Sequence, residues 1–175
     1  MQKEIRIAGT GGMGVVLAGV IVGHSAVVYG GLNAVQSQSY GSEARGTAAK
    51  SEVIIGDGDI HFPKVRKSDF FVVMSQSALD KYIDDAEPGS LIIVDPDLVD
   101  TTGLEDKYEL VEIPAMKTAD DFGVRLASNM VMLGALIKKS GLFPLEALEN
   151  GVRDMVPEKY LEIDMKAIRA GAELV

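Results

Sequence analysis

The segment Ile5-Arg6-Ile7-Ala8-Gly9-Thr10-Gly11-Gly12-Met13-Gly14, with the apolar run that follows it, decides the fold of this chain. Residues 5–8 are typical of a short buried strand, and residues 15–28 of a helix that stops before Gly30-Gly31. Between them, Gly9, Gly11 and Gly14 match the pattern G-x-G-x-x-G. This order of strand, glycine loop and helix predicts an α/β fold with a mostly parallel, doubly wound, Rossmann-like sheet.

The glycines of this loop are expected to have separate uses. The first permits a tight turn, the second a close approach of backbone or phosphate, and the third close packing of helix on strand. The N-terminus of the following helix presents unpaired N–H groups, which suit an anion. We therefore expect a phosphate-bearing cofactor to bind the loop formed by Gly9, Gly11, Gly12, Met13 and Gly14.

Length and charge limit the classes of function. At 175 residues the chain is expected to form a single domain over residues 1–175, with a substantial core. Its net charge of −9 argues against nucleic acid as a partner. Residues 1–79 carry seven Lys/Arg and six Asp/Glu, a balance of +1, whereas residues 80–175 carry ten and twenty, a balance of −10. The glycine loop therefore lies in the half of the chain that does not repel an anionic ligand.

Residue types that are missing narrow the function further. The sequence has no cysteine, which excludes disulfides, a thiol nucleophile and a cysteine-bound iron–sulfur cluster in this chain. Its two histidines are too few for a typical zinc site. No stretch reaches the ~18 apolar residues of a membrane span, and residues 1–4 lead straight into the first strand without a signal peptide. We expect a cytoplasmic protein that contacts no membrane.

The remaining elements continue the alternation of strands and helices, with one interruption. Segments 48–55 and 60–62 resemble a hairpin around the turn at residues 56–59, and predict a small antiparallel insertion at one edge of the sheet. The other strands are predicted at residues 32–36, 69–74, 91–94 and 108–113. Helices are predicted from an N-cap at Ser75 or Ser77, and over residues 119–139, 145–155 and 164–174.

No catalytic group is evident in these patterns. Val15 and Val16 stand where a P-loop has Lys and Ser or Thr, which argues against ATP hydrolysis. The second predicted strand leads into residues 36–39, Gln-Ser-Gln-Ser, instead of the acid that binds the ribose of NAD. No pair of acids has a spacing that indicates acid–base catalysis. We assign no catalytic residue and no metal ligand, a pattern typical of one subunit of a larger enzyme.

A polar, glycine-punctuated loop follows the second predicted strand at residues 39–47. It carries Glu43 and Arg45 between two apolar segments. These charges have two interpretations: an ordinary surface turn, or an arginine that meets a phosphate or a partner chain. The second is favoured by position, because open α/β sheets bind ligands at the C-terminal ends of their strands.

From Ile5 to about Val152 the chain resembles the gamma subunit of 2-oxoacid:ferredoxin oxidoreductases. Residues 9–14 match the family's G-x-G-G-Q-G, with Met13 in place of Gln. Residues 39–47 match S-Y-G-P-E-x-R-G-G, with Ser42 for Pro and Thr47 for the second Gly. Residues 75–78, Ser-Gln-Ser-Ala, match the serine–glutamine turn after the fourth strand, and residues 129–135 match the N-x-x-x-L-G-A helix.

The resemblance implies a multi-subunit, oxygen-sensitive enzyme that oxidatively decarboxylates a 2-oxoacid, forms an acyl-CoA and reduces ferredoxin. Alpha and beta subunits, with a delta or ferredoxin-like subunit, would be its partners and would hold thiamine diphosphate, Mg²⁺ and [4Fe-4S] clusters. The ligand implied for this chain is coenzyme A, whose phosphates suit the glycine loop and Arg45. The motifs add to the cofactor site Tyr40, Gly41, Glu43, Ser75 and Gln76.

Several alternatives stay open on the sequence alone. A separate gamma chain favours the 2-oxoglutarate enzyme over a pyruvate- or branched-chain-specific member. A free-standing NAD(P) dehydrogenase would need the missing ribose acid. A purely structural subunit would use its glycines for close packing alone. In each case the apolar helix 15–28 and the Met- and Leu-rich segment 119–139 predict that the isolated chain self-associates as a homodimer.

Overall fold

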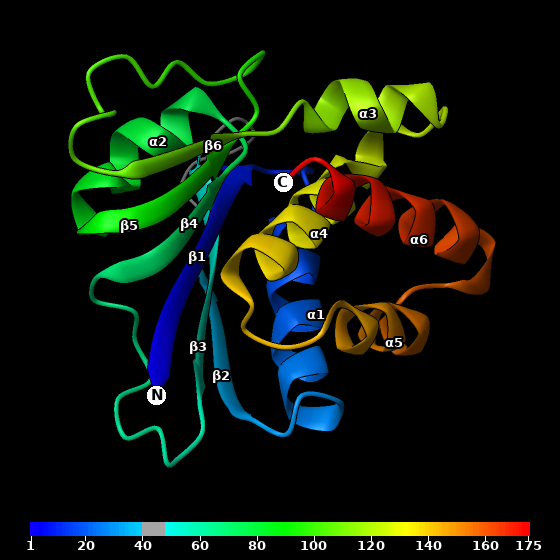
Figure 1. Ribbon diagram of the computed structural model, residues 1–175, viewed down its shortest axis with the longest axis horizontal. Helices are drawn as coiled ribbons and strands as arrows, with labels where there is room; N and C mark the ends of the chain where they lie inside the picture. Colours follow the sequence, from blue (N-terminus) through cyan, green and yellow to red (C-terminus); the bar gives the residue numbers. More distant parts are fainter. Residues whose placement is uncertain (40–47) are drawn as a thin grey trace.

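The computed structural model describes residues 1–39 and 48–175. Its centre is one mixed sheet with the strand order β2-β3-β1-β4-β5-β6 (Figure 1). Strands β1, β4, β5 and β6 are parallel neighbours, as the sequence predicts for a doubly wound fold. The strands span Gln2–Thr10 (β1), Asn33–Ser39 (β2), Ala48–Gly56 (β3), Ser68–Val73 (β4), Ala86–Val94 (β5) and Glu109–Glu112 (β6).

The antiparallel insertion is a single strand, and it lies inside the sheet. Strand β3 runs antiparallel to β1 on one side and to β2 on the other. Residues 60–62, predicted to pair with it, form no strand. The hairpin prediction was therefore wrong, because β3 takes its hydrogen-bond partners from β1 and β2. Apolar alternation identifies a strand without identifying its neighbours.

Helices cover both faces of the sheet and enclose two cores. The larger core lies between the sheet and helices α1 (Val15–Val28), α4 (Ser128–Ser140), α5 (Leu145–Met155) and α6 (Glu158–Glu173). The smaller core lies under α2 (Gln76–Tyr82) on the opposite face (Figure 1). Strand β1 serves both, because Ile5 and Ile7 face the larger core while Ala8 faces the smaller one.

The face under α2 also holds a buried ion pair. Arg6 on β1 is 1% exposed and lies directly opposite Glu52 on β3. Its Nε donates to the Glu52 carboxylate at 2.9 Å, and its Nη1 donates to the carbonyl of Asp85. Lys50 lies 3.3 Å from the same carboxylate, and the Arg6 guanidinium lies over the Tyr82 ring at 5.6 Å. The Glu52 carboxylate thus compensates the positive charge of Arg6, which has almost no contact with solvent.

The segment predicted as one long helix over residues 119–139 is divided. Helix α3 (Ala115–Asp121) ends before Gly123, whose φ of +80° no helix interior allows. A short 3-10 turn, η2 (Arg125–Ala127), then leads into α4. The prediction was wrong because the apolar periodicity continues across the glycine. As a result Leu126, an apolar residue within the predicted helix, is 73% exposed.

The C-terminal helices pack closely on the larger core. Helix α6 begins at Glu158, six residues before the predicted start, and crosses α4 where both helices carry glycine. A Cβ on Gly134 would lie 2.0 Å from the carbonyl oxygen of Ile168, and one on Gly171 would lie 1.9 Å from that of Val131. Gly134 therefore serves helix packing. None of the helices formed by residues 1–39 and 48–175 is long and apolar enough to cross a membrane.

Candidate functional site

The glycine loop lies at the C-terminal edge of the sheet, between the end of β1 and the start of α1. Its turn is closed by the N–H of Met13, which donates to the carbonyl of Thr10 at 3.3 Å. Gly12 and Gly14 have φ values of +87° and +75°, which side-chain-bearing residues rarely adopt. Gly14 is the N-cap of α1, so the loop leads directly into the first turn of that helix.

The structure shows which glycines of the loop are closely packed. Gly9 is one of them, because an added Cβ would meet Met13 Sδ at 3.0 Å and Met74 Cβ at 3.1 Å. At Gly14 an added Cβ would lie 2.4 Å from Nδ2 of Asn129, a residue of α4. At Gly11 it would meet no described atom within 4 Å. Gly12 likewise meets no described atom within 4 Å, so Gly11 and Gly12 together leave open space for a ligand.

The loop borders a pocket of about 340 Å³ that suits an anionic group. Among the described residues no side chain caps α1, and its first turn holds no acid. The N–H groups of that turn therefore stay available, at the positive end of the helix dipole. The pocket is lined by Thr10, Gly11, Gly12, Gly14, Val15, Val16, Leu17 and Ala49. Apart from the Thr10 hydroxyl these side chains carry no polar group, so the remaining polar contacts of the pocket come from the backbone.

Met13 turns back onto its own loop. Its thioether sulfur accepts a hydrogen bond from the N–H of Thr10 at 3.4 Å and packs against Gly9. The side chain that stands in place of the family's glutamine is thus a support for the turn. The first-turn N–H groups of α1 are unaffected by this substitution.

The second motif, with Tyr40, Gly41, Glu43 and Arg45, lies outside the described residues. The chain on either side of it can be placed. Ser39 ends β2 opposite Lys50, and Ala48 begins β3 opposite Thr10 of β1. Both ends of the segment are therefore at the edge of the sheet that carries the glycine loop.

Ser75 and Gln76 follow β4, the neighbour of β1 in the sheet. Ser75, one of the two serines predicted as the N-cap of α2, is the N-cap, and its Oγ accepts from the N–H of Ala78 at 3.2 Å. Gln76 has a different environment. Its Oε1 accepts from the N–H of Asp100 at 2.7 Å, and its Nε2 donates to Asp80 at 3.0 Å. The polar groups of Gln76 are therefore already engaged within the chain.

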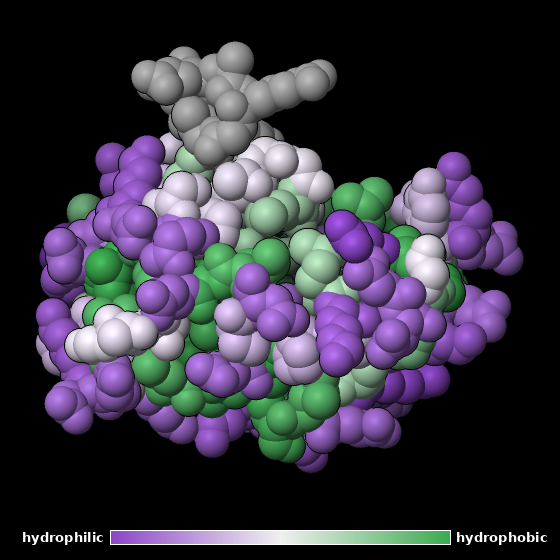
Figure 2. All heavy atoms as spheres, turned by 90° about the horizontal axis from the view of Figure 1, so that it is seen from above, coloured by the Kyte–Doolittle hydropathy of each residue, from purple (hydrophilic) through white to green (hydrophobic). Residues whose placement is uncertain are grey.

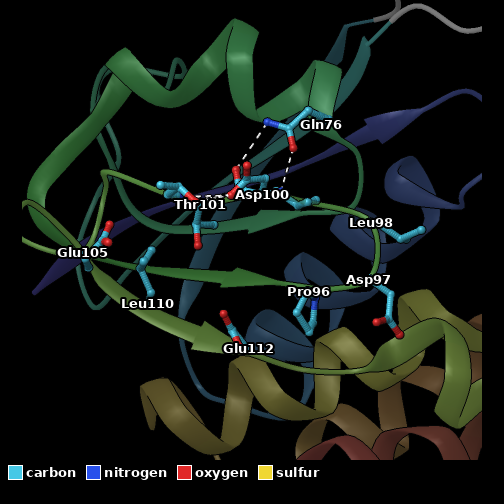
Figure 3. Close-up of a pocket in the computed structure, with 11 residues that line it drawn as sticks. Gln76, Pro96, Asp97, Leu98, Asp100, Thr101, Glu105, Leu110 and Glu112 are labelled. Carbon is cyan, nitrogen blue, oxygen red and sulfur yellow. Dashed lines mark hydrogen bonds between the residues drawn. The ribbon is translucent and has the colours of Figure 1, made fainter.

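Gln76 lines a second pocket, of about 640 Å³, which the glycine loop does not share (Figure 3). Its labelled lining includes the acids Asp97, Asp100, Glu105 and Glu112. The hydroxyl and N–H of Thr102 donate to Asp100 at 2.6 and 3.0 Å and lower the pKa of that carboxyl. This pocket is negatively charged at neutral pH and disfavours a phosphate. The structure thus brings the glycine loop and Ser75 to one edge, and turns Gln76 to another pocket.

The sequence analysis missed one contact of the loop. Asn129, quoted only as part of a helix motif, is 5% exposed and reaches Gly14 from the start of α4. Its Nδ2 donates to the carbonyl of Gly14 at 3.2 Å. The only sequence signal was a polar residue at the start of an otherwise apolar helix.

The comparisons with known proteins agree with this architecture. The family model described as pyruvate ferredoxin/flavodoxin oxidoreductase matches residues 4–174. The 2-oxoglutarate synthase subunit KorC of Methanothermobacter thermautotrophicus is 45% identical, over 100% of this chain and 96% of its own length. KorC of Methanocaldococcus jannaschii is 44% identical, over 99% and 94%. The ketoisovalerate oxidoreductase subunit VorA of M. thermautotrophicus is 29% identical, over 98% of this chain and 36% of its own.

Two solved structures share the fold. The gamma subunit of a keto/oxoacid ferredoxin oxidoreductase from Geobacter sulfurreducens matches with a TM-score of 0.89 and 41% identity, over 99% of this chain and 95% of that one. The 2-oxoglutarate:ferredoxin oxidoreductase of Magnetococcus marinus matches with a TM-score of 0.84 and 23% identity, over 99% and 31%. That enzyme was solved with 2-oxoglutarate, coenzyme A and succinyl-CoA bound.

Proposed function

The chain belongs to the pyruvate ferredoxin/flavodoxin oxidoreductase family, and we propose that it is the gamma subunit of a cytoplasmic 2-oxoglutarate:ferredoxin oxidoreductase. The whole chain, residues 1–175, would be the gamma-type domain. The reaction is the oxidative decarboxylation of 2-oxoglutarate with transfer of the acyl group to coenzyme A and of electrons to ferredoxin. The choice of oxoacid is supported by 45% identity to KorC against 29% to VorA.

The role proposed for this chain is to bind the phosphates of coenzyme A. The observation that carries it is the open space at Gly11 beside the uncapped N-terminus of α1. A helix N-terminus with free N–H groups is a general site for phosphate. The pocket at the loop is about 340 Å³, room for phosphate groups and part of the chain attached to them. Arg45, with Tyr40, Gly41 and Glu43, is proposed to complete this site.

The other cofactors are assigned to partner subunits. Thiamine diphosphate, Mg²⁺ and [4Fe-4S] clusters belong, in this proposal, to alpha and beta subunits and a delta or ferredoxin-like subunit. A sequence without cysteine offers no thiolate for a cluster, which supports the assignment. The chain alone is therefore expected to be inactive.

The fold disfavours the NAD(P) dehydrogenase alternative. In a dinucleotide-binding fold the strand after the first helix pairs with β1, so that its acid reaches the ribose. Here β3 lies between β1 and β2. The end of β2 is therefore two strand spacings, about 10 Å, from the end of β1, instead of one. Residues 36–39 at that end also lack an acid.

Reconstitution tests the proposal. The chain is produced with its partner subunits under anaerobic conditions, and reduction of ferredoxin is measured with 2-oxoglutarate, pyruvate or 2-oxoisovalerate. We expect activity that requires coenzyme A and is highest with 2-oxoglutarate. Titration calorimetry of the same complex should show binding of coenzyme A and no binding of NADH. Preference for another oxoacid would refute the substrate assignment. Full activity of the complex without this chain would refute its proposed role in coenzyme A binding.

A further inference from the structure

The start of α1 and the start of α4 are joined by one side chain. Asn129 Nδ2 donates to the carbonyl of Gly14 at 3.2 Å, and Asn129 Oδ1 accepts from the N–H of Met130 at 2.9 Å. Gly14 and Asn129 are 115 residues apart in sequence. Asn129 is 5% exposed, and its hydrogen bond to Gly14 is partly buried. A single carboxamide therefore holds two helix N-termini together.

Only an amide satisfies both partners at this place. The carbonyl of Gly14 accepts a hydrogen bond from Nδ2 and the N–H of Met130 donates one to Oδ1, which fixes the orientation of the Asn129 amide. An aspartate has the same shape, but its carboxylate would place an acceptor against the Gly14 carbonyl. It would also add a negative charge beside the anion-binding loop. The side chain that the structure requires is therefore specific in chemistry as well as in size.

The hydrogen bond from Asn129 holds the Gly14 peptide, whose orientation sets the direction of the N–H groups in the first turn of α1. The carbonyl of Gly14 also accepts the first hydrogen bond of α1, from the N–H of Ala18 at 3.0 Å. Gly14 has a φ of +75°, and a Cβ there would lie 2.4 Å from Nδ2 of Asn129. The close approach of Asn129 to Gly14 therefore requires a glycine at position 14, and so does the backbone conformation there. If the Gly14 peptide turned, the N–H groups of the first turn would turn with it.

We infer that Asn129 is a positioning residue, which holds the glycine loop in its anion-binding form through Gly14. This inference rests on the proposed function, because the anion it serves is a phosphate of coenzyme A. Asn129 itself lies behind the loop and is absent from the lining of the loop pocket. It acts through the backbone of Gly14.

The test compares Asn129→Asp with Asn33→Asp in the reconstituted complex. Asn33 is a matched control, because its Nδ2 also donates to a glycine carbonyl, that of Gly58, at 3.0 Å and at the opposite edge of the sheet. The net contribution of one such hydrogen bond, if all of it is lost from binding, corresponds to about 2- to 13-fold weaker binding. We expect a rise of this size in the KM for coenzyme A with Asn129→Asp, a kcat within about twofold at saturation, and no change with Asn33→Asp.

Hydrogen exchange of residues 9–18 supplies a readout that does not require coenzyme A. Asn129→Asp should speed exchange in this segment, and Asn33→Asp should not. Asn129→Ser is the second variant, because it adds no charge and its shorter side chain falls short of the Gly14 carbonyl. It should show the same exchange change with a folded protein.

The outcomes separate the two proposals. If the wild-type complex does not bind coenzyme A, the proposed function fails, and the exchange data still decide whether Asn129 holds the loop. If exchange at residues 9–18 is unchanged in both Asn129 variants, the inference is refuted. Faster exchange with an unchanged KM for coenzyme A would refute the positioning role and leave Asn129 a purely structural residue.

Discussion

Gly11→Ala separates a ligand-binding loop from a loop built for packing. At Gly11 an added methyl group would meet no described atom within 4 Å. Gly11 is also absent from the glycines with positive φ, so alanine can adopt its backbone conformation. The substitution should therefore leave stability unchanged or raise it by about 0.4–1 kcal/mol, since alanine restricts the unfolded chain.

The same methyl group would occupy the space where a phosphate approaches the N-terminus of α1. Hydrogen bonds to a charged group contribute about 1.5–3 kcal/mol. Losing one therefore weakens binding by about 10- to 150-fold. We expect the KM for coenzyme A of the reconstituted enzyme to rise by this factor. The half-reaction of oxoacid decarboxylation at the thiamine cofactor should remain near the wild-type rate.

Gly58→Ala is the matched control for this experiment. Gly58 also has open space around it among the described residues and no positive φ, and it lies at the opposite edge of the sheet. Its variant should keep both the wild-type melting temperature and the wild-type KM. A stable Gly11→Ala protein with an unchanged KM for coenzyme A would refute the loop as the phosphate site. A loss of folding in Gly11→Ala alone would show that this glycine is needed for packing.

Three further predictions concern stability and assembly. Arg6→Ala should lower the free energy of unfolding by about 3–5 kcal/mol in urea titrations, because it leaves the buried Glu52 carboxylate without its main ion-pair partner. A variant as stable as the wild type would contradict this prediction. Burial raises the pKa of Asp164 to about 6 from 3.8, so the folded state binds more protons than the unfolded state between these values, and stability falls as pH rises from about 4 to 6. Asp164→Asn should therefore gain more in melting temperature at pH 7.5 than at pH 4.5, and an equal gain at both would oppose the assignment. Leu126 is 73% exposed and lines a groove of about 240 Å³ together with Leu17 and Tyr160. We expect this groove to support self-association of the isolated chain. Light scattering should therefore show a dimer, and Leu126→Ser should weaken it.

One exposed face of the molecule agrees with a protein that works in contact with others. Figure 2 shows hydrophobic residues gathered between hydrophilic ones on the face seen from above, beyond what a few isolated side chains would give. Such a surface is expected to be buried against a second copy of the chain or against other subunits. This is the physical reason for both the dimer prediction and the proposed assembly. A clean monomer at micromolar concentration would count against the first of these.

Local sequence was sufficient where a local rule decides the structure. Helix α1 has the predicted bounds Val15–Val28, because its apolar run is framed by a glycine loop and by Gly30-Gly31. Helix α5 likewise begins and ends as predicted, and Ser75 caps α2 through its own hydroxyl. Loops and caps of this kind depend on residues within one or two turns of each other. For the same reason the family motif around the glycine loop could be identified from residue spacing.

Long-range contacts decided the rest. Nothing in the period of residues 48–55 indicates that they pair with both β1 and β2 inside the sheet, because side-chain alternation is the same for either place. Gly123 ends a helix by a φ of +80°, although glycine in an apolar pattern is often tolerated. The sequence alone thus determined the glycine loop and the bounds of α1 and α5, and the binding of an anion at that loop stays a prediction. Tertiary structure decided which strands are neighbours and brought Asn129 to Gly14, because hydrogen-bond partners 115 residues apart meet only in the packed chain.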